Sequence, residues 1–88
     1  MNKVSLEVTY RHGRAIAAYL YLPRRTEDKA EHSRRVGSLV ADLTQDGRLI
    51  GVEFTSARNV DVNALDQLLA EYKVPSVAHS DLAPLLAA

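Results

Sequence analysis

The chain has 88 residues, which leaves room for one domain with one hydrophobic core and none for a second catalytic lobe. Eleven Lys and Arg residues balance eleven Asp and Glu residues, so no net charge draws the chain to nucleic acid, and the absence of Cys excludes disulfides, thiolate metal sites and cysteine nucleophiles. No apolar run approaches the roughly 20 residues of a membrane span, and the first residues show no signal-peptide pattern, so we expect a cytoplasmic protein that does not enter a membrane.

The first predicted elements are two strands joined by a turn at His12-Gly13. Residues 4 to 10 alternate between apolar and polar side chains, which is typical of an edge strand with one wet face. The next segment, residues 14 to 22, is apolar on both sides. One side carries Ala15, Ala17, Tyr19 and Tyr21, and the other carries Ile16, Ala18, Leu20 and Leu22. A strand without a polar face belongs in the middle of a sheet that is covered on both sides.

A charged segment follows the second strand. Pro23 ends that strand because it lacks a backbone N–H, and residues 24 to 31, nearly all charged or polar, predict a solvated loop. Acidic residues interrupt the basic cluster that begins here, and no aromatic residue is interleaved to stack on bases. We therefore favour a solvated loop. The alternative is an anion or nucleic-acid contact through Arg24, Arg25, Arg34 and Arg35.

Residues 39 to 54 predict a hairpin whose register follows from its turn. A two-residue loop at Asp46-Gly47 requires positive φ, which Gly adopts freely and Asp tolerates. Pairing across this loop produces three apolar pairs on one face: Leu43 with Ile50, Ala41 with Val52, and Leu39 with Phe54. A four-residue loop would keep this face, whereas a three-residue loop would not. Gly37 and Gly51, placed inside strands, indicate a bulge or a close backbone approach.

One amphipathic helix and an apolar tail complete the chain. Residues 62 to 72 form the predicted helix, and Asn59 or Asp61 is placed to cap its first turn. The apolar stripe of this helix consists of Leu65, Leu68, Leu69 and Tyr72. In the tail, residues 75 to 88, Ser80-Asp81 can cap a last short turn. The tail is apolar enough to dock on this sheet or on a neighbouring molecule, with a disordered terminus as the alternative.

These elements together predict a single α+β domain over residues 1–88. We expect a small antiparallel β-meander of two hairpins, with about four strands, followed by one amphipathic helix packed on one face of the sheet.

The two hairpins resemble a known family. The residues that carry the resemblance are Tyr10, Ala18-Tyr19-Leu20-Tyr21-Leu22 and, above all, Asp46-Gly47-Arg48-Leu49-Ile50-Gly51-Val52-Glu53. Over about residues 8 to 60 the chain is similar to the small bacterial domain of unknown function numbered twenty-two eighty-three, although Arg11-His12-Gly13-Arg14 stands where members carry acidic residues. The resemblance implies a β-meander with a helix and no assigned activity. Genes for such domains often lie beside those of small ribonuclease-like toxins, which implies an antitoxin-like role.

Residues that could perform chemistry are scattered along the sequence. His12, His32 and His79 have no partner at metal-ligand spacing, so we expect neither a metal nor a cofactor. His79-Ser80-Asp81 contains the residue types of a triad, but adjacent residues cannot surround one substrate atom, and a helix start fits better. Asp42 and Glu53 share the polar face of the second hairpin, where solvated charges are a better interpretation than paired catalytic carboxylates. We therefore expect no enzyme.

The predicted function is protein interaction. Residues 1–35 carry eight Lys or Arg against four acids, and residues 36–88 carry three against seven, so the halves have charges of +4 and −4 that can complement each other or a partner. One helix covers only one side of the central strand. The other side is left for a homodimer or a small protein partner, unless the tail seals it. The expected interface residues are Tyr19, Tyr21, Leu82 and Leu85.

Overall fold

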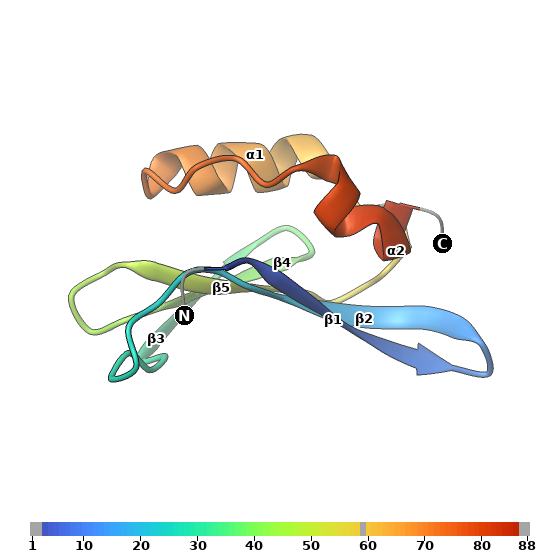
Figure 1. The fold of residues 1–88 in the computed structure, drawn as a ribbon, viewed down its shortest axis with the longest axis horizontal. Helices are drawn as coiled ribbons and strands as arrows, with labels where there is room; N and C mark the ends of the chain where they lie inside the picture. Colours follow the sequence, from blue (N-terminus) through green and yellow to red (C-terminus); the bar gives the residue numbers. More distant parts are fainter. Residues whose placement is uncertain (1–2, 59, 87–88) are drawn as a thin grey trace.

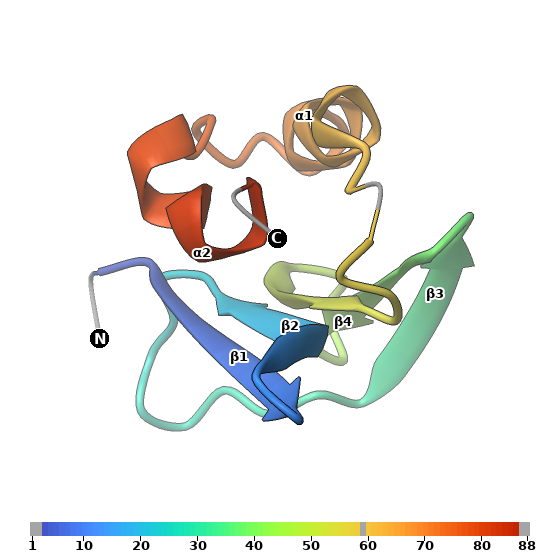
Figure 2. The ribbon, with the colours of Figure 1, turned by 90° about the vertical axis from the view of Figure 1, so that its right-hand side faces the viewer.

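The structure, a computed structural model, describes residues 3–58 and 60–86 and is built on a five-stranded antiparallel sheet of order β1-β2-β5-β4-β3. The strands are β1 (Ser5–Arg11), β2 (Arg14–Tyr21), β3 (His32–Val36), β4 (Leu39–Leu43) and β5 (Leu49–Phe54). The helical elements are α1 (Val62–Glu71), the 3-10 turn η1 (His79–Leu82) and α2 (Ala83–Leu86), and they all lie on one side of the sheet (Figure 1, Figure 2). The α+β class and the antiparallel sheet are confirmed. The prediction of about four strands and one helix is corrected to five strands and two short α-helices.

The first hairpin has the turn that its sequence predicts. Arg11 pairs with Arg14, and both loop residues have positive φ, 52° at His12 and 76° at Gly13. Positive φ at both positions matches a two-residue loop to the twist of its flanking strands. β1 is an edge strand, as predicted, and β2 lies inside the sheet between β1 and β5.

The strand β3 is the element that the sequence pattern does not predict. Its residues are polar or charged except for Val36, and it lies at the second edge of the sheet, where charged side chains protect an edge from unwanted pairing. Val36 pairs with Leu39 across the two-residue loop Gly37-Ser38, with a φ of 60° at Gly37. Gly37 therefore forms a turn, and the expectation of a bulge or close approach there is wrong.

The second hairpin keeps two of its three predicted pairs. Leu39 pairs with Phe54 and Ala41 with Val52, whereas Leu43 pairs with Leu49 in place of Ile50. The difference arises from a register shift between Asp42 and Leu43.

The loop of this hairpin explains the shift. The Gly47 N–H donates to the Thr44 carbonyl at 3.0 Å, and the Thr44 N–H donates to the Arg48 carbonyl at 2.9 Å. Gly47 alone in this loop has positive φ, at 88°. This is the arrangement of a three-residue loop followed by a bulge, and the predicted two-residue loop is wrong. The bulge compensates for the odd loop length, so the apolar face is kept beyond it.

The helix α1 begins where its cap predicts. The Ala64 N–H donates to the Asp61 carboxylate at 3.0 Å, which satisfies one of the unpaired N–H groups of the first turn. The other predicted cap, Asn59, lies outside the described residues. The predicted stripe packs on the core through Leu65, Leu68 and Leu69, which are buried, and Tyr72, which is partly buried.

The tail folds back onto the same core. Val77, Leu82 and Leu85 are 6%, 0% and 3% exposed, and they belong to one cluster with the buried residues of α1 and the sheet. Over the residues that the structure describes, up to Leu86, the tail thus docks on its own domain. It does so on the side of α1, so it does not seal the other face of the sheet (Figure 2).

The strand β2 is therefore covered by helices of the described residues on one side only. Ala18, Leu20 and Leu22 face the core, whereas Tyr19 and Tyr21 remain on the side without helices. The alternative in which the tail seals the second side of β2 is wrong, because α1 and the tail share one face. Within residues 3–58 and 60–86, the structure has no helix of the length and apolarity that a membrane span requires.

Candidate interaction surface

The helix-free side of the sheet is organised in rows that follow from the strand register. One row runs from β1 to β3 through Glu7, Tyr19, Glu53, Val40 and Arg35. The neighbouring row runs through Ser5, Tyr21, Gly51, Asp42 and Ser33. Residues directly opposite each other, and residues two apart on one strand, share a face. We call the surface formed by these ten residues the open face.

Two tyrosines occupy the middle of the open face. The ring centroids of Tyr19 and Tyr21 are 4.6 Å apart at an interplanar angle of 60°, an edge-to-face arrangement. The Tyr21 hydroxyl donates to Glu7 at 3.5 Å, and the Arg24 guanidinium lies 5.5 Å from the Tyr21 ring centroid. Both rings are partly buried by their neighbours on the sheet. These contacts restrict the movement of each ring, and each ring presents an apolar surface with a polar hydroxyl to a partner.

Gly51 provides the space in which Tyr19 lies. A Cβ atom at Gly51 would be 2.0 Å from the Tyr19 hydroxyl oxygen, so the ring lies directly over the glycine. The Tyr19 hydroxyl donates to Asp42 at 2.7 Å. Burial, and then this bond to a carboxylate, raise the pKa of Tyr19, so the hydroxyl stays protonated at neutral pH. The close approach predicted at Gly51 is confirmed, and its partner is a side chain from β2.

A shallow depression lies beside Tyr19. It is lined by Glu7, Thr9, Ala17, Ala18, Tyr19 and Glu53. The lining comes from β2 and from the two strands beside it, β1 and β5, which contribute the carboxylates of Glu7 and Glu53. The open face therefore combines an aromatic centre with acidic surroundings.

Only two of the four predicted interface residues lie on this surface. Tyr19 and Tyr21 are at its centre, whereas Leu82 and Leu85 are buried in the core on the opposite side of the sheet. The leucines are inaccessible to a partner in this fold because the tail packs against its own domain. We therefore do not retain them as interface residues.

The four predicted anion-binding arginines do not form one patch. Arg24 donates to the Ile50 carbonyl at 3.1 Å, and the Arg25 backbone N–H donates to Asp28 at 2.9 Å. Arg34 pairs with Glu71 of α1, on the helical side, while Arg35 belongs to the open face. Consecutive residues of a strand point to opposite faces, which separates Arg34 from Arg35.

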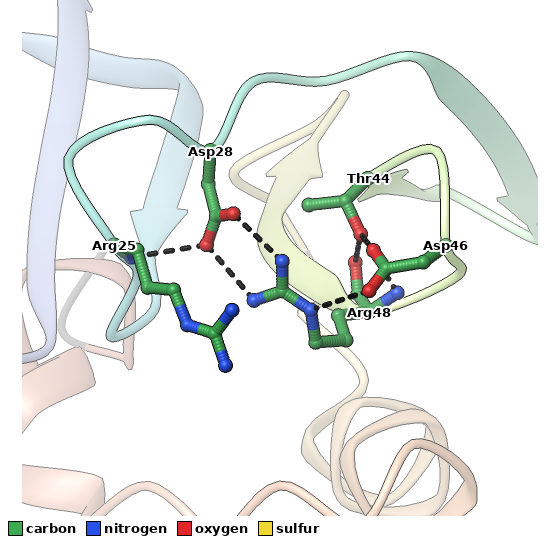
Figure 3. Close-up of polar contacts among 5 residues, drawn as sticks. All are labelled: Arg25, Asp28, Thr44, Asp46 and Arg48. Carbon is green, nitrogen blue, oxygen red and sulfur yellow. Dashed lines mark hydrogen bonds and ion pairs between the residues drawn. The ribbon is translucent and has the colours of Figure 1, made fainter.

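A polar network ties the 22–31 segment to the β4–β5 loop (Figure 3). Arg48 donates to both carboxylate oxygens of Asp28, at 3.0 and 2.7 Å, and to Asp46 at 3.1 Å. These bonds, followed by the N–H of Arg25, lower the pKa of Asp28 from 3.8 to about 2. The hydroxyl of Thr44, and then Arg48, likewise lower the pKa of Asp46. The network is internally satisfied, which indicates a structural clamp.

The remaining candidates for chemistry stay apart. His12, His32 and His79 are exposed, and no group of His, Asp and Glu residues fit to hold a metal occurs among the described residues. Asp42 and Glu53 both lie on the open face, as predicted. Asp42 accepts bonds from Tyr19 and from Ser33, the latter at 3.4 Å, whereas Glu53 is exposed.

The surface around the tyrosines also includes Glu7, Gly51 and Arg35, which the sequence pattern did not assign to it. Glu7 could have been placed there by the alternation of β1, because it pairs with Tyr19 across the first hairpin. No local signal places Arg35, since β5 comes between β2 and β4 and this strand order is a long-range property.

No family model, curated protein or solved structure matches the chain. The resemblance to the bacterial domain numbered twenty-two eighty-three therefore remains a prediction that rests on the residues quoted for it.

Proposed function

We propose that this chain is a non-catalytic protein-interaction module that binds through its open face. The observation that carries the proposal is the pair of tyrosines in the middle of a five-stranded sheet face that no helix covers. Tyrosine contributes a large contact area at a small cost in side-chain entropy, and its hydroxyl is satisfied by polar neighbours. The bond from Tyr19 to Asp42 holds that ring before any partner arrives, which lowers the entropic cost of binding.

The groups on the open face favour recognition over reaction. An activated nucleophile needs an adjacent base that is free to take its proton. Here the Tyr19 hydroxyl has a raised pKa, and the carboxylate that it meets, Asp42, already accepts bonds from two hydroxyls. Both oxygens of Asp42 thus already accept a hydrogen bond within the fold.

The partner class follows from charge and from the resemblance. On the open face, the acidic Glu7, Asp42 and Glu53 outnumber the basic Arg35 and the Arg24 guanidinium that lies beside Tyr21, which suits a basic protein surface. A ribonuclease-like protein has such a surface because it binds an anionic polymer. An antitoxin-like role, implied by the resemblance, would use the open face to cover that basic surface.

Site-specific photocrosslinking in cells tests the proposal. A benzophenone amino acid at Thr9, which borders the depression, should give a crosslinked protein, and Tyr21→Ala in the same chain should reduce its yield. The matched position is Gln67, exposed on α1, which should give none. Equal adducts from both positions, or adducts from Gln67 alone, would place the interaction elsewhere. Mass spectrometry of the adduct separates a different protein from a second copy.

A further inference from the structure

We infer that the open face is occupied by a second copy of this chain, packed face to face about a two-fold axis that runs along β5. The inference rests on the proposed function in that the open face binds a protein, and it names a second copy of the chain as that protein in place of the basic partner proposed above. Its starting point is the strand order, in which β5 is central, with β2 and β1 on one side and β4 and β3 on the other.

The strand order determines which strands meet. A half-turn about an axis that is parallel to β5 and lies between the two sheets exchanges the two sides of the sheet. It brings β1 of one copy over β3 of the other and β2 over β4, and each contact occurs twice. Positions along the strands are unchanged by this rotation, so each row of one copy lies over the same row of the other.

The row that contains Tyr19 becomes complementary under this rotation. Glu7 meets Arg35 of the second copy, which pairs opposite charges at both edges of the interface. In the next row, Tyr21 lies over Asp42 of the second copy. A two-fold axis perpendicular to the strands would place β1 over β1 and would lose the contact between Glu7 and Arg35. Charge complementarity therefore selects the axis along β5.

The middle of the interface contains one unfavourable self-contact, because Glu53 lies over Glu53 of the second copy. Beside the axis, the Tyr19 ring of each copy covers Gly51 and lies between the two sheets. The contact area follows from the size of the sheet. With neighbouring strands about 4.8 Å apart, the two rows and their margins cover about 300–400 Å² of the five-stranded sheet. This area is smaller than the roughly 800 Å² that each partner buries in a standard interface. The association is therefore weak, and it is measured at high protein concentration.

Sedimentation equilibrium with charge-reversal variants tests the inference. The wild-type mass should rise from 9.7 kDa toward twice that value as concentration increases from ~10 µM to ~1 mM, the range expected for a small interface.

Glu7→Arg and Arg35→Glu should each weaken association by a factor of about ten or more, because each places two like-charged pairs in the dimer. The double variant restores both pairs with reversed signs and should return to within about threefold of wild type. Asp81→Arg, the same change of charge on the helical side, should leave association unchanged. Glu7 and Arg35 are exposed, and circular dichroism checks that each variant is folded.

Glu53→Gln separates a second copy from a basic partner. It removes a repulsion between copies and should strengthen self-association severalfold, whereas it would weaken binding to a basic protein. A mass of 9.7 kDa at every concentration, or a double variant as weak as the single ones, overturns the inference. If the chain stays monomeric while Thr9 crosslinks a different protein, the inference fails and the proposed function stands. If Thr9 crosslinks nothing, the proposed function fails as well.

Discussion

Gly51 determines the shape of the open face because it has no side chain. Tyr19 lies in the space that a Cβ would occupy, and from there its hydroxyl reaches Asp42. The resemblance includes this glycine in its most specific segment, and the structure provides a physical reason for a glycine there. A larger residue would force the aromatic ring away from the sheet.

We predict that Gly51→Ala releases Tyr19 and lowers its pKa. The ring must move by rotation of a side chain, so the fold persists, with a loss of about 1–2 kcal/mol for the hydrogen bond to the carboxylate. Because burial and Asp42 both raise the pKa of Tyr19 in the wild type, its release shifts that pKa back toward 10. Ultraviolet titration of the tyrosines measures the shift.

Tyr19→Phe is the matched control for this titration. It should remove the transition of Tyr19, which in the wild type lies above the ordinary tyrosine value. A Gly51→Ala variant with the wild-type titration curve would show that the ring does not depend on the glycine.

At the scale of elements, features that depend on local sequence were predictable, whereas an element without a clear local pattern was not. The turn at His12-Gly13, the pairing of Leu39 with Phe54 and the cap at Asp61 were predictable because each depends on neighbouring residues. The strand β3 was not, since an exposed edge strand needs no apolar alternation; its local signal is the loop Gly37-Ser38.

The candidate site shows the same division. Alternation along β2 places Tyr19 and Tyr21 together, and the sequence predicts this correctly. Alternation also separates Arg34 from Arg35, but only once β3 is known to be a strand. The burial of Leu82 and Leu85 depends on which face the tail chooses, and their own sequence carries no such information.

The clamp between Asp28 and Arg48 predicts a pH-dependent contribution to stability. The folded-state pKa of Asp28, about 2, is below its ordinary value of 3.8, so the contribution is fully present above about pH 4 and is lost as pH falls through 2. Asp28→Asn should therefore lower the melting temperature at pH 7, and the difference from wild type should shrink below pH 4 and vanish only well below pH 2.

Glu27→Gln is the control for this effect, because Glu27 is an exposed acid in the same segment. It should melt like the wild type at every pH. A difference between Asp28→Asn and wild type that is as large at pH 2 as at pH 7 would mean that the clamp does not depend on the charge of the carboxylate.

At the scale of the whole molecule, one hydrophobic core joins the sheet, α1 and the tail. Buried residues from the sheet, from α1 and from the tail form a single cluster, so the tail is part of the same core. Because the tail packs against its own domain, its buried residues are not available to a partner, whereas the open face is. A chain of this size buries a smaller fraction of its surface than a large domain, so each buried residue of the tail matters to stability.

Two leucines of the tail, one buried and one exposed, test whether the tail stabilises the core. Leu82 is 0% exposed and Leu86 is 44% exposed, although they are four residues apart. Leu82→Ala should lower the free energy of unfolding by about 2–5 kcal/mol, because it removes buried methyl groups and leaves a cavity, whereas Leu86→Ala should change it by less than about 0.5 kcal/mol. Urea denaturation of both variants measures the difference, with an unchanged slope expected if the native state keeps its size. Equal and small losses would place the tail outside the core. In that case Leu82 would again be available to a partner, and the open face would not be the only apolar surface to consider among the described residues.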